Sequence, residues 1–500
     1  MRQNISFLPS LQLGTRVETG EPLLLYGDGL RRHRVLYGLS GYGKSKLITS
    51  LSVQLLNLGI PFACIDPHSD LADDTLSILL ATGFFAHEKA FDRLWYIRFA
   101  DPSHAVPFNW LKQPFSPQQI AANFLECCKR VWQNLDEGSS VTFENIIQSA
   151  TTVLCENNRP LTDLARLLSD PLFRERLLEG VSDPVVLEFF HTRFDHYGKM
   201  ALESTLRRVF LLSFSPPLRA ALGSTDNLIN FSRIVDEGIS VIFDLGGLDE
   251  QTQRFLGVLL TVGFEMAMLA RATQPKATRK PYNLIIDEWF QFLNHSPESL
   301  QRLLDLTRKF GMTLSLISQN LSQTRDIRAA LQNCLQIAFR LGHDDAKAAA
   351  TRFTEPFVQH EELPFWQDLL LSVLVAGPTN VQGDEEPTKP SHWETRLKHL
   401  PKGHALVHIA NRTVEIQTLT VPPLVNQREL TRLKAAYARR LLQPLSPKAA
   451  VPEPKREKDN SAKAPTSSVA DTTVKRQSRR RTPVSENSYL STKQDKEETR

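Results

Sequence analysis

An eight-residue glycine-rich stretch limits what this chain can fold into more than any other part of the sequence. Residues 38–45 read GLSGYGKS and match the pattern G-x-x-x-x-G-K-[ST] in full. A short apolar segment at residues 34–37 precedes the stretch, and a helical run at 45–58 and a second apolar segment at 61–65 follow it. This strand, loop, helix, strand order predicts an α/β fold with a mostly parallel sheet covered on both faces.

The chemistry of this stretch predicts a nucleotide-binding loop. Glycines let consecutive backbone N–H groups turn around phosphate oxygens, where a Cβ atom would obstruct the turn. Lys44 is expected to reach the β and γ phosphates, and the Ser45 hydroxyl is expected to bind Mg²⁺. The predicted cofactors are therefore ATP and Mg²⁺, and the predicted loop residues are Gly38, Ser40, Gly41, Tyr42, Gly43, Lys44 and Ser45. The alternative, a glycine-rich turn that matches by chance, does not explain the strand before it and the amphipathic helix after it.

A pair of acids follows another apolar segment much later in the chain. Residues 282–288 read YNLIIDE, which predicts a buried strand that ends at Asp287 and Glu288. The carboxyl ends of parallel strands meet at one edge of a sheet, so we expect these acids beside the glycine loop. Asp287 is then the predicted magnesium ligand, and Glu288 the base that polarises the attacking water. Two solvated loop acids are the alternative.

Two further candidates follow the acids. Residues 300–310 predict a helix that ends at Gly311, with Arg308 in its last turn, where a cation also interacts favourably with the helix dipole. A strand at 313–317 comes next, and Gln319 after it is placed to sense the γ-phosphate or to position water. Taken alone, this Gln is an ordinary surface residue.

The pattern of elements predicts five regions. They are an N-terminal β segment at 1–30, the first part of an ATPase core at 31–115, an all-helical insertion at 116–225, the second part of the core at 226–444, and a disordered tail at 445–500. Apolar residues recur at intervals of three and four throughout the insertion. The tail lacks apolar content and carries 13 Lys and Arg against 8 Asp and Glu, which leaves 46 basic and 47 acidic residues elsewhere. A nucleic-acid contact must therefore come from a local patch, or from the tail, whose alternative role is solubility.

Composition excludes several other classes. The five cysteines show no C-x-x-C spacing, so neither a zinc ribbon nor a redox motif is indicated. The longest apolar stretch, residues 255–270, contains Glu265 and falls short of the ~18–20 residues of a membrane span, so we predict a buried helix. With no apolar signal region near Met1, we expect a cytoplasmic protein without a transmembrane segment of its own.

Together these motifs resemble the HerA/FtsK branch of P-loop ATPases, and within it the type IV secretion coupling proteins of the TraD kind. Four more segments carry the likeness: IDPHSDL at 65–71, IIDEWFQF at 285–292, RKFG at 308–311 and LPKGHA at 400–405. The resemblance implies a RecA-like fold and a hexameric ring with ATP at each subunit interface. It makes Arg308 a candidate arginine finger and Gln319 a sensor, while Asp66 and His68 match a family segment that can also be a polar turn. Arg32, just before the first core strand, is a further candidate nucleotide contact.

The resemblance also implies a function. The coupling proteins that this chain resembles are motors that translocate DNA, with partners such as the relaxosome or secretion-channel proteins. The resemblance then implies that DNA contacts lie in the helical insertion. Many coupling proteins carry N-terminal membrane helices, whereas this sequence begins almost directly at the ATPase. Three interpretations stay open: a soluble variant, a protein peripheral at the inner membrane through partners, or one with another DNA-handling task. Two alternatives stay open: an ATPase that delivers protein effectors to a secretion channel, and a slow ATP-dependent switch or scaffold.

Overall fold

The computed structural model describes residues 9–132, 137–197, 199–293, 297–319, 331, 334–353, 390–409, 412–421 and 426–445. Within these residues the strands form one 11-stranded sheet and one two-stranded sheet. The strands of the large sheet are β1 (Ser10–Arg16), β2 (Pro22–Tyr26), β3 (Arg34–Tyr37), β4 (Phe62–Asp66), β5 (Leu94–Arg98), β7 (Ser240–Asp244), β8 (Tyr282–Asp287), β9 (Met312–Ser318), β10 (Leu335–Ala338), β11 (His404–Ile409) and β12 (Arg412–Thr418). Strands β6 (His104–Ala105) and β13 (Gln443–Pro444) form the small sheet. The predicted disordered tail lies outside the described residues, apart from Leu445.

The large sheet has a parallel part and an antiparallel part. Its order is β2-β1-β12-β11-β10-β3-β9-β8-β4-β7-β5, and all pairings from β10 to β5 are parallel. The pairings from β2 to β10 are antiparallel. The predicted α/β class with a mostly parallel sheet is therefore confirmed. The hairpin β1–β2 joins the same sheet through β12, so these N-terminal strands extend the core sheet.

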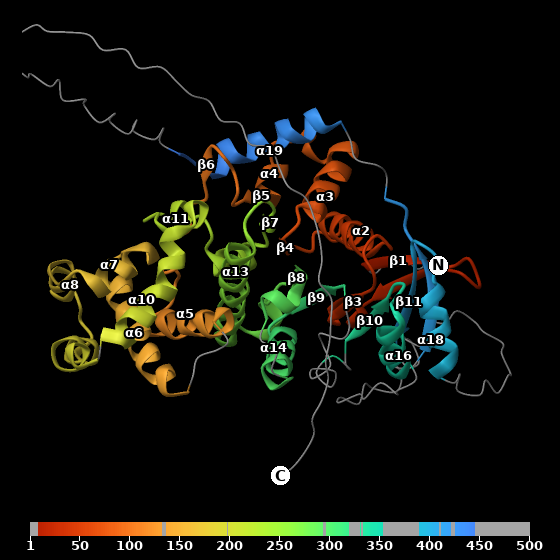
Figure 1. Cartoon of the computed structure of the whole chain (residues 1–500). Coiled ribbons are helices and arrows are strands. Elements are labelled where there is room, and N and C mark those ends of the chain that lie inside the picture. The colour runs from red at the N-terminus through yellow and green to blue at the C-terminus, as the bar shows by residue number, and fades with distance from the viewer. Residues whose placement is uncertain are drawn as a thin grey trace, which may run out of the picture. The chain divides into compact units, whose positions relative to one another are not determined.

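Helices cover both faces of the sheet because its strands alternate between two cores. On β3, Val35 and Tyr37 belong to one buried cluster and Leu36 to the other. The cluster of Leu36 also contains side chains of α2 (Lys44–Asn57), α3 (Asp70–Ala81) and α19 (Gln427–Leu441). The cluster of Val35 contains those of α13 (Glu250–Ala270), α14 (Pro297–Lys309) and the helices between β6 and β7. Figure 1 shows α2 and α13 on opposite sides of the strands.

The regular elements described between β6 and β7 are helices, apart from an isolated bridge between Phe108 and Asn227, and these helices lie together beside α13 (Figure 1). The longer helices here are α5 (Pro117–Val131), α6 (Glu137–Glu156), α7 (Leu164–Ser169), α8 (Pro171–Leu178), α9 (Pro184–Glu188), α10 (Lys199–Phe214), α11 (Pro216–Leu222) and α12 (Phe231–Glu237). Short helical turns occur at η2 (Leu161–Asp163), η3 (Phe189–Arg193) and η4 (Phe194–His196). Elsewhere the chain forms α1 (Asp28–Arg31), η1 (Phe84–Ala86), α4 (Ala90–Arg93), η5 (Arg271–Thr273), η6 (Lys276–Thr278), η7 (Trp289–Gln291), α16 (His343–Arg352) and α18 (Pro390–His399).

Helix α13 is the predicted apolar helix, and the structure buries it. Residues Glu250–Thr273 are long and apolar enough to cross a membrane, but 78% of the most apolar window is buried inside the fold. Glu265 in this helix accepts two hydrogen bonds from Arg130 of α5, at 2.7 and 2.9 Å. This ion pair ties the helices between β6 and β7 to the core, and it explains why an acid occurs in an otherwise apolar helix.

Candidate functional site

The glycine loop connects the carboxyl end of β3 with the first turn of α2. Gly41 and Gly43 have φ values of 82° and 119°, a conformation that a side chain would strain. Lys44 begins α2, and its Nζ donates to the carbonyl oxygens of Gly38 at 2.6 Å and Leu39 at 3.1 Å. The lysine is 7% exposed and therefore lies inside the curve of the loop. The free N–H groups of the first helical turn lie at the same place, which is typical of an anion site.

Two segments from the far end of the chain hold this loop. The carbonyl oxygen of Arg340, just after β10, accepts a hydrogen bond from Leu39 N–H at 2.8 Å. The Gly403 N–H donates to the carbonyl oxygen of Tyr42 at 3.0 Å. The Arg340 guanidinium lies over the half-buried Tyr42 ring, 5.3 Å from its centroid. We did not predict Arg340 from the sequence, whereas Gly403 belongs to the LPKGHA segment at 400–405.

The structure brings the two acids to the same edge of the sheet as the loop. Strand β9 lies between β3 and β8, with Ser318 opposite Tyr37 and Ile317 opposite Asp287. All three strands therefore end at one level, and the glycine loop and Glu288 come directly after them. Burial lowers the pKa of Lys44, and the charges of Glu288 and Asp287 act in the opposite direction. The glycine loop and the acids thus lie at one edge of the sheet, on strands separated by β9, and their roles in the reaction stay predictions.

Both acids are buried, which is costly for charged groups. Burial, followed by the charges of Asp66 and Glu288, raises the pKa of Asp287 to about 7. Glu288 is 4% exposed and has a positive φ of 47°, a strained conformation for a residue with a side chain. Its Oε2 atom is buried without a hydrogen-bond partner among the described residues. A buried carboxylate oxygen that accepts no hydrogen bond from the described residues, close to a buried lysine, is typical of a site that binds a further polar group.

The residues at this edge fit ATP and Mg²⁺. The Ser45 hydroxyl and the Asp287 carboxylate offer the oxygen ligands that Mg²⁺ prefers. No group of three His, Cys, Asp or Glu side chains that could hold a metal exists in the described part of the chain. A magnesium ion here would therefore need oxygens from phosphates or water, which is its usual arrangement in nucleotide sites.

The Asp66–His68 segment forms a polar turn between β4 and α3. The Asp66 carboxylate accepts hydrogen bonds from the N–H groups of His68 and Ala72, both at 2.9 Å. Burial raises the pKa of Asp66 to about 7, against the effect of these two bonds. His68 is exposed at the edge. These contacts show that Asp66 caps the first turn of α3, which explains an acid at this position. A role of Asp66 or His68 in the reaction stays a prediction.

A further buried acid, Asp244 at the end of β7, was not predicted. It pairs with Asp66 across the strands and accepts hydrogen bonds from Ser69 Oγ at 2.7 Å and from the Tyr96 hydroxyl at 2.6 Å. The signal was present in the sequence, because residues 239–245 predict an apolar strand and Asp244 lies at its end, as Asp287 does on β8. Its contacts fix the strand ends beside the acids.

The remaining candidates lie at two different edges. Gln319 follows β9, exposed, between the glycine loop and the acids. Arg308 is exposed in the last turn of α14, which leads into the opposite, amino end of β9. Arg32 precedes the amino end of β3, where burial and then the charge of Arg308 lower its pKa. The structure thus brings Arg32 together with Arg308 and not with the loop of its own chain, so its contact with nucleotide stays a prediction.

Comparison with known proteins gives the same fold. No protein-family model matches the chain, and no curated protein sequence matches it. Among solved structures, the bacterial conjugative coupling protein TrwBdeltaN70 matches with a TM-score of 0.51 and 16% identity, over 83% of this chain and 90% of that chain. VirB4 of Thermoanaerobacter pseudethanolicus matches with a TM-score of 0.53 and 12% identity, over 82% and 97%. Plasmid coupling protein TrwB in complex with ADP and Mg²⁺ matches with a TM-score of 0.50 and 16% identity, over 83% and 91%. The chain therefore has the RecA-like P-loop fold of TrwB and VirB4.

Proposed function

We propose that this protein is an ATPase that hydrolyses ATP to move DNA through a ring of identical subunits. The observation that carries the proposal is the meeting of Lys44, Asp287 and Glu288 at one edge of the sheet, with a buried Glu288 oxygen that has no partner among the described residues. A nucleotide switch would not need such a carboxylate, because only hydrolysis requires an acceptor for a proton of water.

Each residue at this edge has a role in the proposal. The N–H groups of the loop and Lys44 bind the phosphates, and Ser45 and Asp287 would hold Mg²⁺. When bound, the ion neutralises charge on the phosphate oxygens. Glu288 accepts a proton from the attacking water, and Gln319 at the end of β9 orients that water or senses the γ-phosphate. The complexes of TrwB with ADP and Mg²⁺ support this assignment of cofactors.

A ring is supported by the position of Arg308. It lies at the amino edge of the sheet, so the phosphates that it can contact are those bound to a neighbouring subunit. A cation placed there stabilises the charge that develops on the transferred phosphoryl group. The likeness to TrwB, a bacterial conjugative coupling protein, supports a role beside other secretion components. The proposal adds a homo-hexamer that works with relaxosome or secretion-channel partners, peripheral at the inner membrane.

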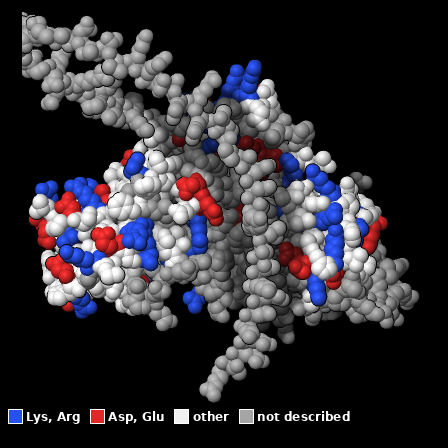
Figure 2. All heavy atoms as spheres, in the orientation of Figure 1, with Lys and Arg blue, Asp and Glu red and all other residues white. Residues whose placement is uncertain are grey.

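DNA as cargo is supported by the same likeness to conjugative and plasmid coupling proteins. Lys and Arg are interspersed with Asp and Glu on the face drawn in Figure 2, without one dominant basic area. On this face a near-neutral body offers no broad basic area, and we assign the DNA contacts to a local lining such as a ring pore.

The test is ATPase activity of size-fractionated oligomers with and without single- and double-stranded DNA, at two salt concentrations. We expect DNA to stimulate hydrolysis, and the stimulation to fall steeply with salt, because phosphate contacts release counterions. Lys44→Ala is the control without turnover. A confirmed oligomer whose activity is unchanged by both kinds of DNA at low salt would exclude DNA as the cargo.

One observation favours a second candidate, an ATPase that passes protein effectors to a secretion channel. Large apolar side chains are exposed on the helices between β6 and β7, at Met200 (88%), Phe214 (83%), Leu172 (73%), Val185 (72%) and Phe210 (55%). Phe210 and Phe214 lie one turn apart on α10, and exposed apolar side chains are more typical of protein contacts than of contacts with phosphates. Binding of proteins and not of DNA by these helices, lost in Phe210→Ser/Phe214→Ser, would favour this candidate.

A further inference from the structure

The turn that presents Arg308 is tied to the strand that carries the glycine loop through one buried histidine. His33 immediately precedes β3, and its ring lies between α14 and β9. Its Nε2 is 2.8 Å from the carbonyl oxygen of Leu304 on α14, and the N–H of Leu314 on β9 donates to its Nδ1 at 2.9 Å. The backbone oxygen of His33 also accepts a hydrogen bond from Leu335 N–H of β10, at 2.8 Å. One residue therefore connects a helix with three adjacent strands.

These two ring contacts define a single protonation state. A backbone N–H can only donate, so Nδ1 must accept from Leu314, and Nε2 must then carry the proton that it donates to Leu304. The ring is fully buried, and burial is the main cause that lowers the pKa of His33 to about 4. The histidine is thus a neutral bridge of fixed orientation at neutral pH.

The carbonyl that His33 binds belongs to the turn of Arg308. In an α-helix the oxygen of Leu304 is also the acceptor for the backbone N–H four residues later, which is that of Arg308. The charge of Arg308 is near enough to affect the pKa values of His33 and Arg32. The bond from His33 therefore fixes the backbone turn from which the Arg308 side chain extends.

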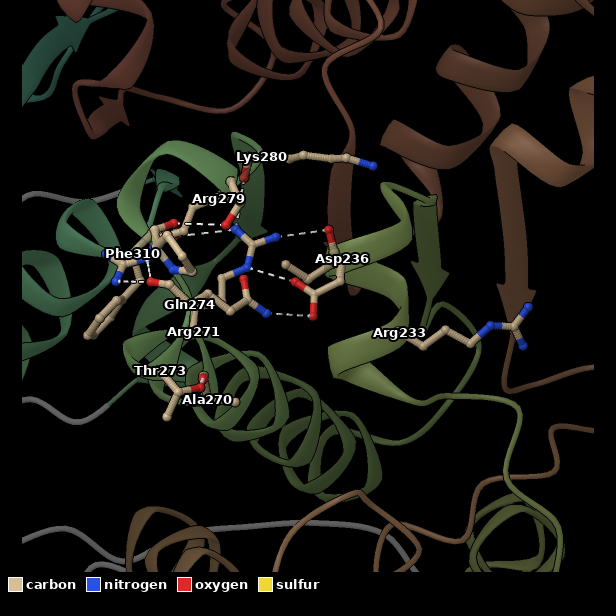
Figure 3. Close-up of polar contacts among 12 residues, drawn as sticks. Arg233, Asp236, Ala270, Arg271, Thr273, Gln274, Arg279, Lys280 and Phe310 are labelled. Carbon is tan, nitrogen blue, oxygen red and sulfur yellow. Dashed lines mark hydrogen bonds and ion pairs between the residues drawn. The ribbon is translucent and has the colours of Figure 1, made fainter.

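A second group of contacts holds the other side of the same turn (Figure 3). The buried Arg271 donates through Nη1 to the carbonyl oxygens of Lys280 at 2.8 Å and Phe310 at 3.3 Å, and through Nε to Asp236 at 3.0 Å. Arg279 Nη1 donates to the carbonyl oxygen of Lys309 at 3.2 Å. Since these bonds fix the chain just after Arg308, the contact with His33 decides how the turn sits against β3.

We propose that His33 is a positioning residue for Arg308. His33 links β3, the strand before the glycine loop, to the arginine that contacts a neighbouring subunit. The inference rests on the proposed function, because it requires that Arg308 acts on phosphates. It adds a route by which the nucleotide state at one loop reaches the next site: along β3 to His33, and from His33 to α14.

The test is a double-mutant cycle with His33→Asn and Arg308→Ala. The Asn Oδ1 atom can still accept the Leu314 N–H in place of Nδ1, but its side chain is too short to donate to Leu304. We expect His33→Asn to lower kcat about tenfold with little change in KM for ATP, and Arg308→Ala to lower it about 1,000-fold. The double variant is expected to match Arg308→Ala, because a misplaced arginine and an absent one are equivalent. Binding of ADP should be unchanged, since the loop lies at the other end of β3.

The matched control is Tyr282→Phe, which removes another buried hydrogen bond, from the Tyr282 hydroxyl to the carbonyl oxygen of Ile239 at 2.9 Å. It should keep wild-type kcat while it lowers stability. Wild-type kcat in His33→Asn, or an equal loss of kcat in the Arg308→Ala background, overturns the positioning role and leaves the proposed ATPase intact. Full activity of Arg308→Ala instead refutes the role of Arg308 itself. If His33→Asn does not fold, His33→Gln tests the same bond from the other side, because its amide nitrogen can still donate to Leu304 while the acceptor for Leu314 is lost. We then expect kcat near that of the wild type, and a tenfold loss overturns the positioning role.

Discussion

Asp287 is expected to weaken the fold at neutral pH, and Asp287→Asn to strengthen it while it abolishes hydrolysis. The pKa of Asp287 is raised from 3.8 to about 7, chiefly by burial and then by the charges of Asp66 and Glu288. A carboxyl group whose pKa is higher in the folded state binds more protons there than in the unfolded chain. The free energy of unfolding therefore decreases as the pH rises from about 4 to 7.

The size of this effect can be worked out from the shift. About three pKa units give a penalty on the order of 4 kcal/mol at pH 8, which falls to on the order of 2 kcal/mol at pH 5. Asparagine is neutral at both pH values, and its Oδ1 can still accept the Glu288 N–H that Asp287 accepts at 3.1 Å. Asp287→Asn should therefore be more stable than the wild type by about these amounts.

The assay is urea unfolding followed by tryptophan fluorescence, without nucleotide and with a chelator. Asp305→Asn is the matched control, because Asp305 is an exposed acid on α14 and should show no gain at either pH. Mg²⁺ with a slowly hydrolysed ATP analogue should reduce the difference in the free energy of unfolding between Asp287→Asn and the wild type, because the charge of Asp287 is then compensated. A variant no more stable than the wild type at pH 8 would refute the claim that this acid is held at a cost for function.

Three further predictions concern other parts of the structure. Lys44→Ala should lose binding of a fluorescent ATP analogue, whereas Glu288→Gln should keep binding and lose turnover. Rapid turnover in Glu288→Gln would show that Glu288 is not the base. Glu265→Ala leaves the buried Arg130 with fewer partners and should lower the free energy of unfolding by about 3 kcal/mol in urea titrations, with Glu126→Ala as the milder control. Gly257→Ala puts a Cβ atom 2.3 Å from the Phe292 ring and should lower the free energy of unfolding by about 1–3 kcal/mol in the same assay, while an unchanged midpoint would show that Phe292 can move away at no cost.

The sequence was sufficient for the parallel half of the sheet and for its edge residues, for a physical reason. Buried parallel strands are continuous apolar runs, and a run that ends in Gly38 or Asp287 identifies both a strand and the loop after it. The helical period was equally clear in α5 and α13. Glu265 was visible in the sequence as an acid within the apolar run of α13, but the sequence did not indicate its partner. These signals are local, and each can be read without knowing the rest of the fold.

The missed features depend on contacts between distant segments. Strand β12 is only partly buried, so it does not stand out as an apolar run. Strand β5 is different, because its first four residues are apolar and buried, and this local signal was present in the sequence. The role of Arg340 appears only when β10 pairs with β3 and brings its carbonyl to Leu39. The two hydrogen bonds of His33 join residues that are 271 and 281 positions apart, which no spacing rule reveals.

The positions of the two edges also limit how the proposed reaction can work. Strand β9 spans seven residues, or about 20 Å, between the turn of Arg308 and the edge of Asp287 and Gln319. The Arg308 side chain therefore cannot reach phosphates held by the loop of its own chain. If Arg308 takes part in hydrolysis, a second copy is part of the active site, and activity must depend on assembly. A hydrolysis rate per subunit that stays constant on dilution below the concentration of assembly would mean that one chain is sufficient, and that Arg308 is only a cation at a helix end.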